Sequence, residues 1–255
     1  MRPAKGRAKG FTLLEIVIVL AIIAVIAGLA VAAYTNVGTA SAPRNALNDF
    51  SAGLVRARSM AIENQSNVWL IVYPDFNKQT MSNAGGKGAW FIYEDRNGTF
   101  GLASGAPTST DVYWLSSAGG VAFDPAADTI RGSTETEGAL RDAVYLDDYA
   151  GNNVEFGLPT GGITMTAAHA PFASLSVTTD CTFCSGTPAR GAIVFSPDGS
   201  ARFINDAGAV VASAGATSVS RARAVVLKDK QTPATRTWVV AVSGPTSFVG
   251  TYELR

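Results

Sequence analysis

The chain opens with a long uninterrupted hydrophobic stretch, and no side chain between Ile16 and Ala33 is polar or charged. A helix of about 20 apolar residues is long enough to cross the hydrocarbon core of a bilayer. Because lipid cannot satisfy backbone N–H and C=O groups, such a segment is expected to be helical. The pattern therefore predicts one membrane-spanning helix near the N-terminus.

After Tyr34 the pattern becomes amphipathic. Apolar residues recur at steps of three or four, the period of a helix, at Leu47, Phe50, Leu54, Ala57 and Ala61. A helix running from Phe11 to about Asn64 would be about 80 Å long at 1.5 Å per residue. A proline kinks a helix, so a bend is expected near Pro43. The alternative is a true break between Gly38 and Pro43 that separates a membrane anchor from a second helix.

From Asn67 the sequence alternates between short runs of β-branched or aromatic residues and turn-forming residues, which predicts strands. The long segment Ser116–Asn153 is rich in Gly, Asp and Glu and is predicted to be a loop. The pattern favours an α+β fold in which the helix packs on an antiparallel sheet. The expected strands are Val68–Tyr73, Trp90–Glu94, Val112–Leu115, Val154–Gly157, Ile163–Thr166, Ala192–Phe195, Ala201–Ile204, Ala224–Leu227, Trp238–Val242 and Phe248–Glu253.

The formal net charge of zero hides an asymmetry. The first ten residues contain four basic side chains and no acid, which leaves the remainder with an excess of acidic residues. Basic residues before an apolar helix place the N-terminus in the cytoplasm and the rest of the chain outside it. A cleaved secretory signal is the alternative, although its apolar region would be shorter. A mildly acidic domain is poorly suited to non-specific binding of nucleic acid, which depends on neutralising phosphates.

One acid, Glu15, lies at the start of the apolar run. A carboxylate in a membrane segment is unfavourable by about 2.5–3.5 kcal/mol on insertion scales, so it usually has a partner and a role. If the bond between Gly10 and Phe11 were cut, the new α-amino group of Phe11 in a neighbouring chain could be that partner. A single buried charge pair is a good device for setting register between subunits.

The run Gly10-Phe11-Thr12-Leu13-Leu14-Glu15 resembles the leader motif of type IV prepilins and type II secretion pseudopilins. The resemblance implies that a prepilin peptidase cuts after Gly10 and methylates Phe11, and that Glu15 serves assembly. It implies a leader at 1–10, a methylated transmembrane helix at 11–36, an amphipathic continuation at 37–65 and a β-rich domain at 66–255. The fold implied is pilin-like.

Two further stretches resemble the GspH/FimT group of minor pseudopilins and pilins: Ala57–Ile62 followed by Val68–Leu70, and the hairpin containing Pro197-Asp198-Gly199. This resemblance implies a structural minor subunit of a type II secretion pseudopilus or a type IV pilus. The implied partners are other pilins or pseudopilins, a prepilin peptidase, an inner-membrane platform protein and an assembly ATPase. The implied location is the bacterial inner membrane with a periplasmic head, and then the filament.

The polar residues offer little chemistry. Cys181 and Cys184 form one C-x-x-C, whereas four-cysteine zinc sites use two such pairs. A small disulfide loop is expected, with free thiols or a redox or metal site as the alternatives. The single histidine, His169, is predicted to be an exposed loop residue, and Asp147-Asp148 a solvated loop rather than part of a calcium site. No nucleophile elbow, P-loop or dinucleotide fingerprint occurs, so no enzyme, cofactor or metal is predicted.

A competing function is capture of DNA by a pilus-tip subunit, as some FimT-like subunits do. It requires a cluster of basic side chains on one surface. The densest candidates are Arg221, Arg223, Lys228 and Lys230, with Asp229 among them. An alternating strand and a solvated turn would produce the same pattern.

Overall fold

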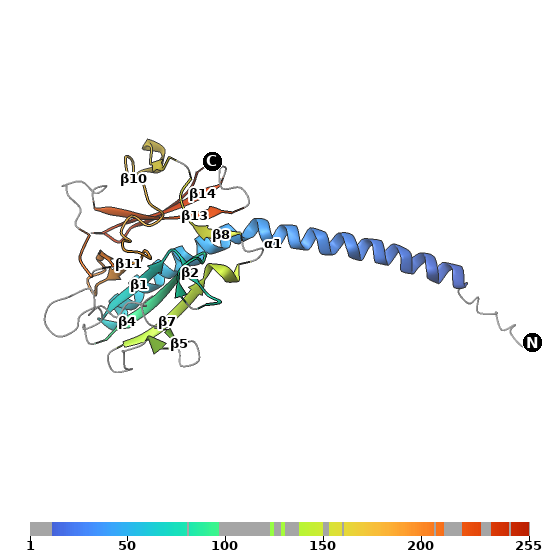
Figure 1. Ribbon diagram of the computed structural model, residues 1–255, viewed down its shortest axis with the longest axis horizontal. Helices are drawn as coiled ribbons and strands as arrows, with labels where there is room; N and C mark the ends of the chain where they lie inside the picture. The colour runs from blue at the N-terminus through green and yellow to red at the C-terminus, as the bar shows by residue number, and fades with distance from the viewer. Residues whose placement is uncertain are drawn as a thin grey trace, which may run out of the picture. The chain divides into compact units, whose positions relative to one another are not determined.

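A computed structural model describes residues 12–80, 82–96, 123–124, 129–130, 138–149, 153–159, 161–206, 208–211, 221–230, 236–244 and 246–254, with backbone alone for 32–40, 82–83, 123–124 and 129–130. The chain divides into two compact units, Met1–Ser41 and Ala42–Arg255. Helix α1 (Leu13–Asn64) contributes residues to both units (Figure 1).

Helix α1 is assigned without interruption through Gly38 and Pro43, so the structure does not contain the break considered as an alternative. Its end coincides with Gln65, which has a positive φ of 52°. A left-handed residue after the last helical position is a common way to end a helix. The Gln65 side chain also donates a hydrogen bond to the carbonyl of Ile62 at 2.6 Å, which satisfies one of the last carbonyls of the helix.

Two antiparallel sheets form the body of the second unit. The five-stranded sheet has the order β12-β11-β1-β4-β7, and its strands are β1 (Asn67–Tyr73), β4 (Ala89–Asp95), β7 (Gly138–Tyr145), β11 (Gly191–Phe195) and β12 (Ala201–Asn205). The four-stranded sheet has the order β15-β14-β13-β8, and its strands are β8 (Val154–Phe156), β13 (Ala222–Asp229), β14 (Thr237–Ser243) and β15 (Val249–Leu254).

Three two-stranded sheets and two short 3-10 helices complete the described elements. The strand pairs are β2 (Phe76–Asn77) with β3 (Ser82–Asn83), β5 (Phe123–Asp124) with β6 (Thr129–Ile130), and β9 (Ile163–Thr164) with β10 (Ser176–Val177); the 3-10 helices are η1 (Leu146–Asp148) and η3 (Ala167–His169). The predicted α+β layout of an N-terminal helix followed by antiparallel strands is confirmed.

The C-terminal part of α1 and both larger sheets share one hydrophobic core. The helix contributes a buried stripe in which two large residues, Phe50 and Leu54, are flanked on each side by alanines. Alanines in such a stripe allow strands to approach the helix closely, so the apolar faces of both sheets can reach it. The helical residues of the stripe are Ala42, Ala46, Phe50, Leu54, Ala57 and Ala61.

The prediction that Ser116–Asn153 forms a loop is wrong for part of this segment. Residues Gly138–Tyr145 form β7, which pairs with β4 at the edge of the five-stranded sheet. An edge strand of this kind has no clean alternation of buried and exposed residues, and the pairing contains a register shift between Ile92 and Tyr93. Arg141 and Asp142, in the middle of the strand, masked its β character in the sequence. The predicted strand Val112–Leu115 lies outside the described residues.

Gly53 supports a specific prediction about helix stability. It is buried in α1, and a Cβ built on it would lie 3.6 Å from both Ile92 Cδ1 and Trp90 Nε1, which is ordinary van der Waals contact. Glycine inside a helix is less stable than alanine by about 0.5–1 kcal/mol. We expect Gly53→Ala to raise the free energy of unfolding by about this amount, measured by urea denaturation of the full chain in detergent with tryptophan fluorescence.

Gly53→Leu is the matched comparison, because a larger side chain would enter the same contacts with no free volume. Overpacking a core typically destabilises by about 1–3 kcal/mol. If alanine at position 53 destabilised the chain as much as leucine did, the packing described for Trp90 and Ile92 would be wrong.

Candidate functional site

The first turn of α1 is closed by a reciprocal pair of hydrogen bonds. The backbone N–H and the hydroxyl of Thr12 both donate to Oε2 of Glu15 at 3.0 Å. In return, the backbone N–H of Glu15 donates to the Thr12 hydroxyl at 3.2 Å. This is a capping box, in which the residue before the helix and the third helical residue satisfy each other's free backbone donors. Glu15 therefore starts the helix, in addition to any role in assembly.

Thr12 is a residue that the sequence interpretation missed as a functional partner of Glu15. The signal was present, because Thr12-x-x-Glu15 before an apolar run is the sequence signature of a capping box. Gly10 and Phe11, the predicted processing residues, lie outside the described residues. The predicted pairing of Glu15 with Phe11 of a neighbouring chain therefore stays a prediction.

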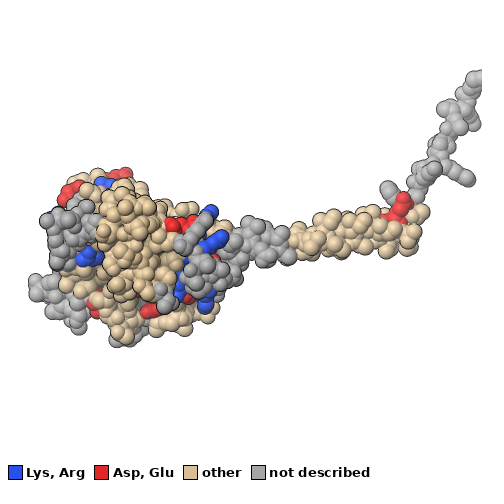
Figure 2. Space-filling view, turned by 90° about the horizontal axis from the view of Figure 1, so that it is seen from above, with Lys and Arg blue, Asp and Glu red and all other residues tan. Residues whose placement is uncertain are grey.

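The segment that follows Glu15 is the part of the described chain suited to a membrane. Leu13–Val31 is long and apolar enough to cross a bilayer, and none of its side chains is buried by the residues that the structure describes. Glu15 is the only charged residue in it (Figure 2). A helix of this kind is stable only in lipid or against other apolar helices, so it can anchor the chain and associate with other chains.

Cys181 and Cys184 are joined in a disulfide, with their Cα atoms 5.2 Å apart. Thr182, which follows Cys181, forms two hydrogen bonds with Ala224 of β13. Its backbone N–H donates to the Ala224 carbonyl at 2.9 Å, and its hydroxyl accepts from the Ala224 N–H at 2.8 Å. Phe183 packs on Phe203 of β12, with ring centroids 5.5 Å apart. The disulfide loop therefore connects the two larger sheets, and neither cysteine is present as a free thiol.

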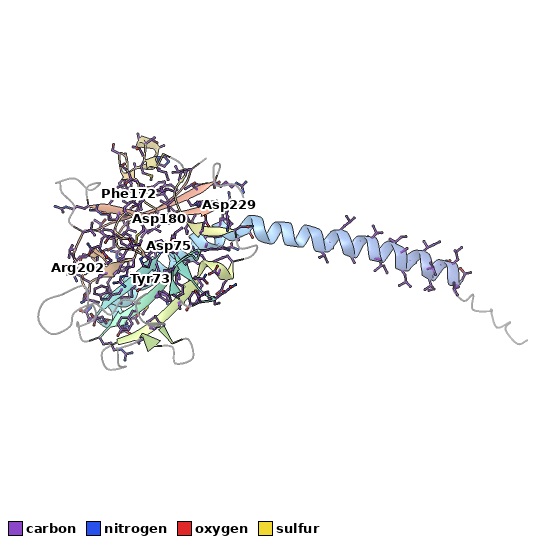
Figure 3. All side chains as sticks on the ribbon, in the orientation of Figure 1. Tyr73, Asp75, Phe172, Asp180, Arg202 and Asp229 are labelled. Atoms are coloured by element: carbon purple, nitrogen blue, oxygen red, sulfur yellow. A yellow bond between two sulfur atoms is a disulfide. The ribbon has the colours of Figure 1, made fainter. Side chains whose placement is uncertain are left out.

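Asp180 lies just before this loop (Figure 3). Burial raises the pKa of Asp180, and the negative charge of Asp75 adds to the effect, while a hydrogen bond from the Cys181 N–H opposes it. That bond is 3.0 Å long. The arrangement stabilises the loop before the disulfide. In the part of the chain that the structure describes, no group of three His, Cys, Asp or Glu side chains could hold a metal ion.

His169 is not the exposed loop residue that the sequence predicted. It ends η3 and is half-buried, and its Nδ1 accepts a hydrogen bond from the Thr166 N–H at 3.0 Å. Its ring also packs edge-on against Tyr252 of β15, with centroids 5.2 Å apart. His169 lies three positions after Thr166, so the turn of the short helix itself brings the two together. The side chain therefore acts as a structural cap.

The two acids considered for calcium binding are engaged with lysines. Asp148 forms an ion pair with Lys78, and Asp147 accepts a hydrogen bond from the Lys78 backbone N–H at 3.2 Å. The Lys87 ammonium lies 3.9 Å from Asp147. The contacts with Lys78 hold η1 against the turn that follows β2. Both carboxylates are therefore occupied by cations of the protein itself.

The four basic residues considered for DNA capture do not form one surface cluster. Arg223 and Lys228 both lie on β13, five positions apart, and residues separated by an odd number point to opposite faces of a strand. Lys228 also forms an ion pair with Glu155 of β8 at 3.0 Å. Arg221 and Lys230 flank the two ends of the strand. The basic character of this region is thus spread along and across the sheet.

Comparison with known proteins identifies the N-terminal segment. Residues 5–31 match the family model described as the prokaryotic N-terminal methylation motif. No curated protein and no solved structure matched the chain. The match covers the region of the capping box and the exposed apolar helix, and it indicates a type IV pilin-like protein that is processed as a prepilin and assembles with other pilins. Such a motif belongs to structural proteins rather than to enzymes.

Proposed function

We propose that the chain is a structural minor subunit of a type II secretion pseudopilus or a type IV pilus, related to the GspH/FimT group. The methylation motif across residues 5–31 is the observation that carries this proposal. It coincides with an apolar helix that has no cover within the described chain and that begins with one carboxylate. The antiparallel body of the second unit supports the assignment as the globular head.

The processing step would create a positively charged α-amino group on Phe11, which is a suitable partner for the Glu15 carboxylate. A prepilin peptidase would cut between Gly10 and Phe11 and methylate the new amino group of Phe11. Glu15 accepts its two bonds from Thr12 through Oε2, which leaves Oε1 for a donor from another chain. Pairing with the Phe11 ammonium of a neighbour would satisfy that oxygen and set the register between subunits.

During assembly, the lipid around the N-terminal helix would be replaced by the apolar helices of other subunits. In the inner membrane, with the N-terminus cytoplasmic and the head periplasmic, lipid covers Leu13–Val31. In the filament, the helices of other pilins or pseudopilins would cover the same side chains. An ATPase and a membrane platform protein would drive the transfer. We do not propose DNA capture, because Arg223 and Lys228 face opposite sides of β13.

Processing can be tested on the full chain in bacteria with and without an active prepilin peptidase. We expect the protein from cells with the peptidase to begin at N-methylated Phe11, as read by N-terminal sequencing and intact mass. Gly10→Leu should retain the leader, because the peptidase needs a small residue at the cut. Gly6→Leu, in the same leader, is the matched control and should be processed normally.

A mature N-terminus at any other residue would contradict the proposal. Glu15→Gln separates cleavage from assembly in the same cells: we expect normal cleavage, with several-fold less protein in the sheared filament fraction. Normal recovery of this variant in filaments would remove the role proposed for Glu15.

A further inference from the structure

Strand β15 lies at an edge of the four-stranded sheet, where β14 is its neighbour on one side. The backbone N–H of Ser243 in β14 donates to the carbonyl of Phe248 at 2.9 Å, so Phe248 and every second residue after it bond to β14. The main-chain groups of Val249 and Thr251 therefore point away from β14. Within the part of the chain that the structure describes, no residue pairs with these groups, which we call the open edge of β15.

The edge of the other large sheet shows how this protein covers such groups elsewhere. Strand β12 also lies at an edge, but its Ala201 N–H donates to the Gly244 carbonyl at 2.8 Å, and its Phe203 carbonyl accepts from the Val211 N–H at 2.8 Å. No segment among the described residues does the same for the open edge of β15. Unpaired main-chain groups along a strand are a template for a further strand.

A groove of about 330 Å³ adjoins the start of β15. Phe248 and Val249 line one side of it, and Val55 and Ile62 of α1 line the other. Among the described residues its lining includes β15 but not β14, which places it on the open side of the strand. Three of its apolar side chains are exposed to solvent, Val55 by 58%, Ile62 by 44% and Phe248 by 49%. Large apolar residues gathered in one concave place are a feature of sites that bind a partner.

Arg58 gives this groove a positive charge. Its guanidinium lies over the turn at Gly199, since a Cβ built on that glycine would be 3.5 Å from Nη2 of Arg58. In the described part of the chain no carboxylate forms an ion pair with Arg58. A guanidinium presents paired donors that match a carboxylate. The groove therefore suits apolar side chains accompanied by one acid.

An extended segment, rather than a helix, matches both the groove and the open edge. A helix bonds its backbone groups internally and would leave Val249 and Thr251 unpaired. In an antiparallel pair, residues opposite each other point to the same face of the sheet. Val249 packs on the core that α1 shares, so residues paired with Val249 and Thr251 would direct their side chains toward α1 and the groove.

We propose that β15 receives an extended segment of another protein, paired antiparallel with Val249 and Thr251. Alternate side chains of this segment are apolar and lie in the groove against Val55 and Ile62, and a carboxylate on the same face pairs with Arg58. Addition of a strand to a sheet edge is a general mode of peptide recognition, in which main-chain bonds supply affinity and alternate side chains supply specificity. The inference concerns the head alone and goes beyond the proposed function, which assigns no partner to this surface.

Binding of a defined peptide to the full chain in detergent micelles tests the proposal. The probe is acetyl-Lys-Val-Thr-Val-Thr-Glu-Lys-amide with a dye on its first lysine; when the peptide is extended, both valines and the glutamate share one face. We expect saturable binding by fluorescence polarisation, above that to micelles alone. N-methylation of the central valine removes a donor that faces β15 and should weaken binding about tenfold. N-methylation of the threonine that follows it is the matched control, because that N–H points away, and should leave binding nearly unchanged.

Variants of the protein show whether the peptide lies at β15. Thr251→Pro removes an outward N–H and leaves the bonds to β14 in place, an orientation in which an edge strand tolerates proline. We expect it to abolish detectable binding, and Thr251→Val, which keeps the N–H, to retain it. Arg58→Gln should weaken binding several-fold. Arg56→Gln is its control, because Arg56 lies on the same helix but pairs with Asp142.

Three results in the peptide assay would overturn the proposal: no saturable binding, equal binding of the two N-methylated peptides, or binding unchanged by Thr251→Pro. The comparison of the two methylated peptides uses the wild-type chain, so it holds even if a variant folds poorly. A dimer of the full chain in sedimentation that Thr251→Pro abolishes would also overturn it, because a second copy would then occupy the edge. None of these measurements depends on leader cleavage, so their failure would leave the proposed function standing.

Discussion

Replacing Phe50 by alanine is expected to lower the free energy of unfolding by about 3–5 kcal/mol, the range for removing a buried phenylalanine. Phe50 is fully buried where α1 meets the sheets. Its ring packs edge-on against Trp90 of β4, with centroids 5.1 Å apart, and against Phe156 of β8, with centroids 6.4 Å apart. These strands belong to different sheets, so the cavity would open at the point where the helix joins both of them.

Urea denaturation of the full chain in detergent, followed by tryptophan fluorescence and by circular dichroism, measures this effect. Val55→Ala is the matched control on the same helix, because Val55 is 58% exposed. Surface substitutions away from special features usually change stability by no more than about 0.5 kcal/mol. Equal losses for Phe50→Ala and Val55→Ala would mean that the helix does not use the buried stripe described here.

The second large effect is expected at a buried ion pair beside the end of α1. The Glu94 side chain is 4% exposed and pairs with Arg141 of β7, whose Nε lies 2.8 Å from Oε2. Asn64, the last helical residue, donates to its other oxygen at 2.9 Å. Arg141→Ala would leave the carboxylate buried without its main partner. We expect a loss of about 2–4 kcal/mol, between the value of a hydrogen bond to a charge and that of a broken buried pair.

Arg56→Ala is the comparison for this variant. Arg56 also pairs with a residue of β7, Asp142, at 3.0 Å, but these side chains are 55% and 36% exposed, and neither is buried as Glu94 is. Exposed ion pairs are typically worth less than about 1 kcal/mol. A loss for Arg56→Ala as large as that for Arg141→Ala would show that burial of Glu94 is not what makes its pair important.

The pH dependence of the Arg141→Ala effect follows from the protonation of Glu94. Burial alone raises the pKa of Glu94, but the hydrogen bonds and charges of Arg141, Arg96 and Asn64 outweigh it and hold the pKa below the ordinary value of 4.5. The ionised carboxylate thus stabilises the wild-type fold above pH 4.5, and this contribution is lost as the pH falls through the depressed folded pKa. Without Arg141, burial is opposed only by Arg96 and Asn64, so we expect the carboxyl to protonate at higher pH than in the wild type. The destabilisation by Arg141→Ala should therefore be largest near neutral pH and shrink below about pH 4.

Local patterns were sufficient to predict the N-terminal helix and the strands that are buried on both faces. In lipid, the apolar run from Ile16 to Ala33 can satisfy its backbone hydrogen bonds only as a helix. Strands β13 and β14 contain nearly continuous apolar runs, rich in valine, because side chains on both faces of these strands are buried. The capping box of Thr12 and Glu15 was equally readable, because its hydrogen bonds join residues three positions apart. For such features the interacting groups are neighbours in sequence, so spacing alone predicts the contact.

Strand β7 and the role of Glu94 could not be predicted in that way. Both depend on groups that are far apart in sequence, because Arg141 meets Glu94 across the pairing of β7 with β4. The amino-acid sequence by itself determined which segment is long and apolar enough to cross a membrane and how its first turn is capped. Tertiary structure alone decided which polar residues are buried with partners and which apolar ones remain exposed, since burial depends on the whole fold rather than on any local pattern.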